Sequence, residues 1–212
     1  MFSFSSKTVV DRTFKLTDLY KQMHASKEAQ KDAAVIESIV LKNVLSPNTL
    51  YCAPEKSVKE IYVFEISVKE RYVPELFIKE LDNSIKLHTL FIVQHEDYEL
   101  CMISYKTGTQ KGKYWQTNWE NQDDFAVPLV TSVPEMYKFI LSKFLAYAPF
   151  ESETVDEYVK RHNLLIKLDF QIGKTQAAIA HETQSKKRFE YNARLKDYIK
   201  QREDLLCGNS VR

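Results

Sequence analysis

The chain has 212 residues, of which 44% are hydrophobic and 28% are charged, and it contains only four glycines and six prolines. This composition excludes collagen-like, low-complexity and disulfide-rich proteins, and the length suits one large domain or a compact domain with an extension. The formal net charge of +1 hides an uneven distribution of acidic and basic residues along the chain.

Three cysteines, Cys52, Cys101 and Cys207, are far apart in the sequence, and no Cys or His pair has the spacing of zinc ligands. This pattern indicates reduced thiols and gives no reason to expect a metal or another cofactor. The longest apolar runs, such as residues 87–93, are about half as long as a membrane span, and residues 1–6 lack the pattern of a signal peptide. We therefore expect a soluble, cytoplasmic protein without membrane contact.

The first part of the chain predicts a leader, a helix and then a strand–helix–strand unit. Residues 1–16 either lie on the core or add an edge strand, and residues 17–46 have the apolar spacing of one amphipathic helix or two. Residues 58–68 alternate with a period of two and are apolar on both faces, which is typical of a central strand. Pro74 opens a helix that leads into a strand beginning at Leu87.

The next part predicts an antiparallel meander followed by one helix. Residues 87–94, 100–105 and 113–119 are separated by turn-like segments, and a short strand follows at residues 125–130. Ser132 is placed to cap a helix that ends before Pro149. We therefore predict for residues 1–148 an α+β domain with a mixed, largely antiparallel sheet of four to five strands, covered on one face by helices.

Residues 149–212 are predicted to form a separate helical arm, because residues 154–206 contain no proline and only one glycine. An apolar heptad stripe begins in this arm, fails at residues 181–188 and resumes out of step. A straight coiled-coil arm and a folded hairpin both fit this pattern. The predicted helix-pairing seam consists of Leu165, Leu168, Ile172, Ile179, Phe189, Leu195 and Ile199.

The arm is also the basic part of the chain. Residues 158–202 contain eleven Lys and Arg against four acidic residues, whereas the rest of the chain has 19 basic residues against 25 acidic ones. This asymmetry predicts an acidic body that carries a cationic arm, which either binds an anionic partner or is a solvated surface. The candidate contacts with nucleic acid or protein are Lys174, Lys186, Lys187, Arg188 and Arg194 in the arm, and Lys111 and Lys113 at a hairpin tip.

No catalytic signature stands out. Residues 171–175 resemble the end of a phosphate-binding loop, but Leu168 stands where the opening glycine would be, inside a predicted helix. A metal-dependent nuclease of the restriction type would need an acid-x-Lys triplet on a strand, and Glu65 and Lys69 are two residues too far apart for it. We interpret these two residues and Glu60 as surface charges, and we assign no catalytic or metal-binding residue.

Four segments together resemble a known family. Residues 45–50, 58–66, 81–93 and 182–192 follow one another in the order found in the bacterial and archaeal domain of unknown function 4391. Members of that family are often encoded beside helicases and DNA-methyltransferase or restriction subunits, so the resemblance implies a role in antiviral defence. It carries over no catalytic residues, since none are established for the family.

These observations favour a non-enzymatic accessory or adaptor subunit of a restriction-modification or helicase-associated assembly. In this hypothesis the body docks on a larger subunit such as a helicase or methyltransferase, and the arm contacts that protein, DNA, or a second copy of the chain. The alternative is a divergent metal-dependent nuclease with Glu60, Glu65 and Lys69 at its centre.

Overall fold

The computed structural model describes residues 2–55, 57–106, 112–121, 125–128 and 130–208. The chain divides into two compact units, Met1–Phe144 and Leu145–Arg212. The change of unit therefore falls four residues before the boundary at 148 that composition indicates.

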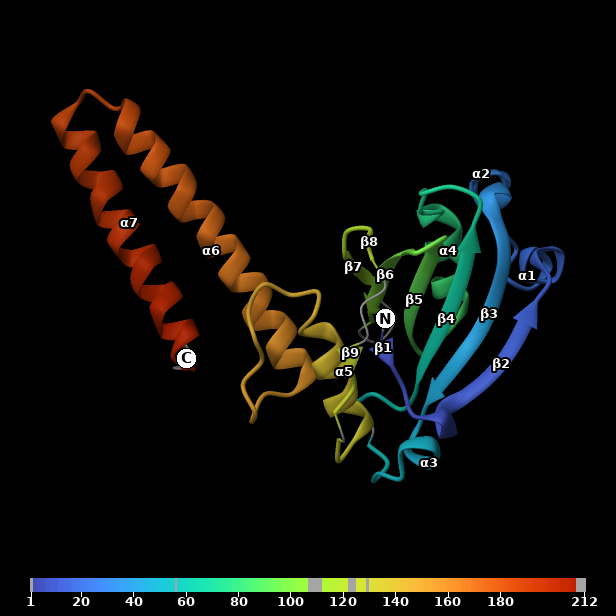
Figure 1. The fold of residues 1–212 in the computed structure, drawn as a ribbon. Helices are drawn as coiled ribbons and strands as arrows, with labels where there is room; N and C mark the ends of the chain where they lie inside the picture. The colour runs from blue at the N-terminus through green and yellow to red at the C-terminus, as the bar shows by residue number, and fades with distance from the viewer. Residues whose placement is uncertain (1, 56, 107–111, 122–124, 129, 209–212) are drawn as a thin grey trace. The chain divides into compact units, whose positions relative to one another are not determined.

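The first unit is built on an open mixed sheet with the strand order β2-β3-β4-β5-β6-β7 (Figure 1). Strands β4 and β5 run parallel, and the other neighbours on this path pair antiparallel. A second, two-stranded sheet pairs β1 with β9 in parallel, and β8 adds a short pairing to β6. The strands are β1 Phe2–Ser3, β2 Val9–Phe14, β3 Ile36–Leu45, β4 Ile61–Val68, β5 His88–His95, β6 Tyr98–Tyr105, β7 Lys113–Gln116, β8 Glu120–Asn121 and β9 Phe125–Ala126.

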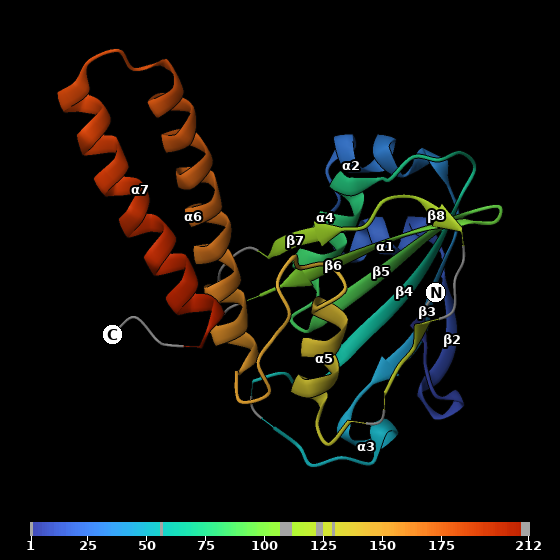
Figure 2. The same ribbon diagram turned by 60° about the vertical axis from the view of Figure 1, so that its left-hand side comes forward.

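Helices cover both faces of the main sheet, rather than the one face predicted (Figure 2). One face packs against α1, α2 and α4, which contribute Leu19, Ala29 and Phe77 to the main core. The other face packs against α5, where the ring of Tyr137 meets His88 of β5 at a centroid distance of 4.6 Å. The helices of this unit are α1 Leu16–Gln22, α2 Lys27–Asp32, α3 Pro47–Leu50, α4 Glu75–Ser84 and α5 Val133–Leu141, with 3₁₀ turns at Ser6–Thr8 and Ala33–Val35.

Strand β4 is central, as its sequence predicts. Phe64 and Ile66 belong to the core beneath α1, α2 and α4, while Ile61 and Val63 are fully buried on the opposite face. Because both sides of its first half are covered, residues 61–64 lack polar alternation, whereas Glu65 and Ser67 in the second half are half-buried. Helix α4 connects β4 to the parallel strand β5, so the predicted strand–helix–strand unit is confirmed.

The predicted helix over residues 17–46 is wrong in its second half, because residues 36–45 form strand β3. A register shift between Ile36 and Ser38 places Ile36 and Ile39 in the same core although they are three residues apart. Such a bulge imitates helical spacing in the sequence. Since β3 and the edge strand β2 join the main sheet, and residues 125–126 belong to the second sheet, the strand count of four to five is also corrected.

The second unit contains a helical hairpin made by α6 Val155–His181 and α7 Ser185–Leu206. Thr154 and Glu157 form a reciprocal capping box at the start of α6, and residues 182–184 interrupt the helix within the segment where the heptad fails. The two helices pack against each other, and the Arg202 Nε atom lies 2.7 Å from Asp169 Oδ1 across them. The arm is therefore folded back on itself. No helix among the described residues is long and apolar enough to cross a bilayer.

Candidate interaction surface on the helical hairpin

A buried ion pair anchors the segment before the hairpin to α6. Arg161 is only 8% exposed, and its guanidinium donates to both carboxylate oxygens of Glu153 at 2.5 and 2.9 Å. The same guanidinium donates to the carbonyl of Ala148 at 2.7 Å. Fork-to-fork bonding of this kind is geometrically specific, so it fixes residues 148–153 against α6.

The seam between the two helices is only partly covered. Leu165 and Leu168 are buried and Ile172 and Ile179 are half-buried, whereas α7 contributes no buried residue. The remaining predicted seam residues differ among themselves: Leu195 and Ile199 are half-buried, and Phe189 is 77% exposed.

Polar contacts of Asp169 also hold the two helices together. Burial acts to raise the pKa of Asp169, but hydrogen bonds from Tyr147 and Arg202 outweigh it, so that the pKa lies below its ordinary value. The bond to Asp169 in turn raises the pKa of Arg202. The carboxylate of Asp169 is thus committed to partners inside this unit.

Two neighbouring cavities open along the hairpin. One has a volume of about 690 Å³ and the other of about 490 Å³, and both are lined by Leu164 and Leu205. Phe150 and Lys160 also line the first cavity, and Tyr198 lines the second. The lining of both cavities therefore mixes apolar side chains with polar and charged ones.

Most of the basic side chains of the hairpin point into solvent. Of the eleven counted from the sequence, Arg161 and Arg202 form ion pairs with acidic residues. The other nine are exposed, and no ion pair joins them to an acidic residue within the described part of the chain. They are Lys160, Lys167, Lys174, Lys186, Lys187, Arg188, Arg194, Lys196 and Lys200. This set includes all five candidate contact residues of the arm.

The two candidate residues outside the arm belong to a different part of the molecule. Lys113 is exposed at the start of β7, and its ammonium lies 5.1 Å from the centroid of the Trp115 ring. Lys111 lies outside the described residues. Both residues belong to the first unit, whereas the cationic surface of the hairpin belongs to the second.

The residues of the nuclease alternative do not converge. Glu60 and Glu65 are five positions apart on an extended segment, which directs their side chains to opposite faces. The Lys69 ammonium instead donates to the carbonyl of Ala34 at 3.1 Å. Among the described residues there is no group of three or more His, Cys, Asp or Glu that could hold a metal ion.

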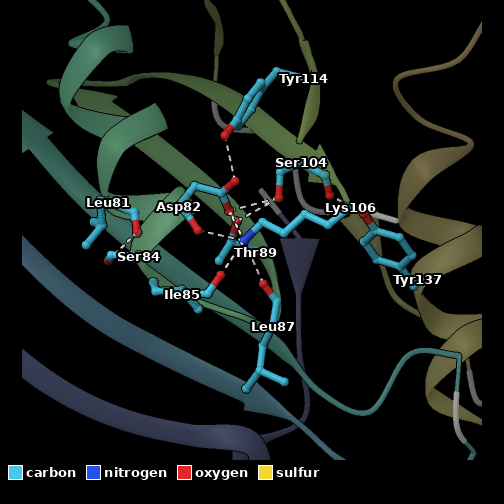
Figure 3. A network of polar contacts seen from close by, with 10 residues as sticks. All are labelled: Leu81, Asp82, Ser84, Ile85, Leu87, Thr89, Ser104, Lys106, Tyr114 and Tyr137. Atoms are coloured by element: carbon cyan, nitrogen blue, oxygen red, sulfur yellow. Dashed lines mark hydrogen bonds and ion pairs between the residues drawn. The ribbon is translucent and has the colours of Figure 1, made fainter. Parts of the chain in front are cut away.

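A buried polar network in the first unit was missed by the sequence analysis (Figure 3). Asp82, at the end of α4, is 0% exposed, and its Oδ1 atom accepts a hydrogen bond from Ser104 at 2.9 Å and a short one from Thr89. Its Oδ2 atom accepts one from the Tyr114 hydroxyl at 2.7 Å. The Lys106 ammonium lies 2.7 Å from Oδ1.

Lys106 also donates hydrogen bonds to carbonyl groups at and just after the end of α4. Its ammonium donates to the carbonyls of Asp82, Ile85 and Leu87 at 2.7, 2.8 and 2.9 Å. Burial lowers the pKa of Lys106 although Asp82 opposes this effect, and burial with the bond to Asp82 raises the pKa of Tyr114. Because each charge in the network has partners, we assign it the structural role of joining α4 to β5, β6 and β7. The acid that follows the apolar residues of α4 was the only sequence signal for it.

The fold defines an α+β sheet domain joined to a cationic helical hairpin. The family model described as Domain of unknown function (DUF4391) matches residues 2–201, and the chain therefore belongs to this family. The match extends over the sheet domain and most of the hairpin. Searches of curated proteins and of solved structures found no match.

Proposed function

We propose that this protein is a non-enzymatic accessory subunit that docks on a larger protein through its helical hairpin. One observation carries the proposal: nine exposed, unpaired basic residues and several exposed apolar ones share one two-helix element within the described chain. Leu164, Ile166, Phe170 and Phe189 are 49%, 45%, 66% and 77% exposed. Of these, Ile166 and Phe170 are one turn apart on α6, and exposed apolar side chains that adjoin in this way are typical of a binding surface.

The partner that we propose is a large subunit of a defence assembly, such as a helicase or a methyltransferase, as the family resemblance implies. The charge distribution supports an acidic binding partner, because the hairpin segment carries eleven basic against four acidic residues. Opposite charge on the two surfaces accelerates association and selects against wrong partners.

The test is the mass of the particle that the full-length chain forms in its native host, measured by light scattering after gentle purification. We expect a mass well above the 24.9 kDa of one chain. The variant with Lys160, Lys167 and Lys174 changed to Glu should elute as the free chain with unchanged circular dichroism. A wild-type particle of one chain only would refute the proposal.

Contact with DNA is a second candidate, supported by three consecutive exposed cations, Lys186, Lys187 and Arg188, in the first turn of α7. Duplex binding through three phosphates would make log K fall with log salt at a slope of about −2.7. Fluorescence anisotropy with a 24-base-pair duplex should show this slope, and changing all three residues to Glu should abolish binding. Salt-independent or absent binding by the wild-type chain would dismiss DNA contact.

A further inference from the structure

Helix α6 carries a second apolar stripe that is separate from its seam with α7. Ile166, Phe170, Gly173, Ala177 and Ala180 follow one another at intervals of four, three, four and three residues. This is the a/d spacing of a helix that packs against another helix. All five are exposed, in contrast to the buried seam residues Leu165 and Leu168.

The middle of this stripe is shaped to receive side chains. A Cβ atom added to Gly173 would meet no atom within 4 Å, whereas Phe170 projects one turn away and is 66% exposed. A large side chain beside small ones gives a projection next to a gap, and the side chains of a second helix can interdigitate with such a surface.

A row of lysines runs along one edge of the stripe. Lys160, Lys167 and Lys174 are spaced by seven residues and are exposed, and the latter two directly follow Ile166 and Gly173 in the sequence. On the other edge the only acid is Asp169, which is already held by Arg202 at 2.7 Å and by Tyr147. The free charge beside the stripe is therefore positive.

We propose that this stripe binds an acidic amphipathic helix of a partner protein. The inference rests on the proposed docking function and specifies its partner. The apolar face of the partner helix lies on Ile166, Phe170 and the small residues beyond them, and its Glu or Asp residues face the lysine row. Helix-in-groove recognition of this kind combines an apolar seam with charges that set orientation and choice of partner.

Two other occupants fit the charges less well. An antiparallel pair formed with a second copy would bring the two lysine rows together, and a parallel pair would offer Lys174 the carboxylate of Asp169, which already has its partners. A nucleic-acid duplex, whose bases are stacked on one another, would leave Ile166 and Phe170 without an apolar contact.

The test uses the two exposed phenylalanines of the hairpin, Phe170 on α6 and Phe189 on α7, each replaced in the full-length chain by the photo-cross-linker benzoylphenylalanine. Irradiation in the native host, followed by mass spectrometry of the linked peptides, identifies the segment that each position touches. From position 170 we expect one protein segment that has an amphipathic helical pattern and a net negative charge.

Variants then test the chemistry of recognition. Changing Lys160, Lys167 and Lys174 to Glu, or Gly173→Glu alone, should reduce the cross-link from position 170 at least tenfold. A matched triple change on α7, with Lys186, Lys196 and Lys200 replaced by Glu, should alter it less than twofold. Circular dichroism and the melting temperature verify folding of each variant.

The outcomes separate this inference from the proposed function. The inference is overturned if position 170 cross-links to a second copy, to nucleic acid or to a protein segment without a net negative charge. It is also overturned if the cross-linking yield stays the same when the three lysines are replaced. Cross-links to a partner from position 189 alone overturn it too but leave the docking function standing. If neither position cross-links and the particle has the mass of one chain, both proposals fail.

Discussion

Replacement of Lys106 by Met should destabilise the sheet domain severely. The Lys106 side chain is 12% exposed and that of its partner Asp82 is 0% exposed, so the variant leaves a carboxylate in the core without its counter-charge. Three carbonyl groups, those of Asp82, Ile85 and Leu87, lose a donor at the same time. Breaking a buried ion pair by removal of one partner costs about 3–5 kcal/mol of unfolding free energy.

Urea denaturation followed by tryptophan fluorescence reports the unfolding of the sheet domain, because both tryptophans, Trp115 and Trp119, lie in that domain. The double variant Asp82→Asn/Lys106→Met should lose less unfolding free energy than the sum of the losses in the two single variants, since it no longer buries an unpaired charge. We expect this difference to be roughly 1–3 kcal/mol. The control is Lys42→Met, which breaks the exposed pair with Asp11 and should cost no more than about 1 kcal/mol. Equal costs for the Lys106 and Lys42 variants, or strict additivity in the cycle, would refute this account of the network.

Three further predictions concern other parts of the chain. Gly173→Ala should stabilise the hairpin by about 1 kcal/mol, since the added Cβ lies in open space within α6, and a lower melting temperature would contradict this. Arg161→Met should release residues 148–153 and speed their hydrogen exchange, while exchange in the sheet domain stays unchanged; unaltered exchange of that segment would show that the ion pair does not anchor it. Alkaline pH should weaken the sheet domain, because burial raises the pKa of Cys101 from 9.0 to about 12 and also raises that of Tyr137. Below their ordinary pKa values both groups are neutral in the folded and the unfolded chain, so their contribution to stability is fully present. Above those values the unfolded chain ionises before the folded chain does, and the free energy of unfolding falls by about 1.4 kcal/mol per pH unit for each group. Urea titrations between pH 8 and 11 should show this fall, with a smaller slope in Cys101→Ala, and a stability that rises over that range would reverse the sign of the argument.

The elements with one clear periodicity were predictable from the sequence. Residues 61–64 are apolar on both faces because this part of the strand is covered on both faces, and the break after residue 181 marks the turn of the hairpin. Strand β3 was not predictable in this way, because its register shifts disturb the period of two on which recognition of a strand depends.

The candidate surface was predictable in its charge but not in its geometry. The lysines and arginines could be counted from the sequence, whereas their exposure depends on which pairs the fold closes, such as Arg202 with Asp169. The stripe through Phe170 was missed because the neighbouring stripe through Leu168 has the same heptad spacing and greater hydrophobicity. The structure distinguishes the two stripes, because the one through Leu168 is buried and the one through Phe170 is exposed.

Hydrogen exchange of the full-length protein, alone and within the particle purified from its native host, tests the docking role of the hairpin most directly. We expect amides of residues 160–180 to exchange at least tenfold more slowly within the particle than in the isolated chain. Protection confined to residues 2–144, with the hairpin unchanged, would contradict the central claim.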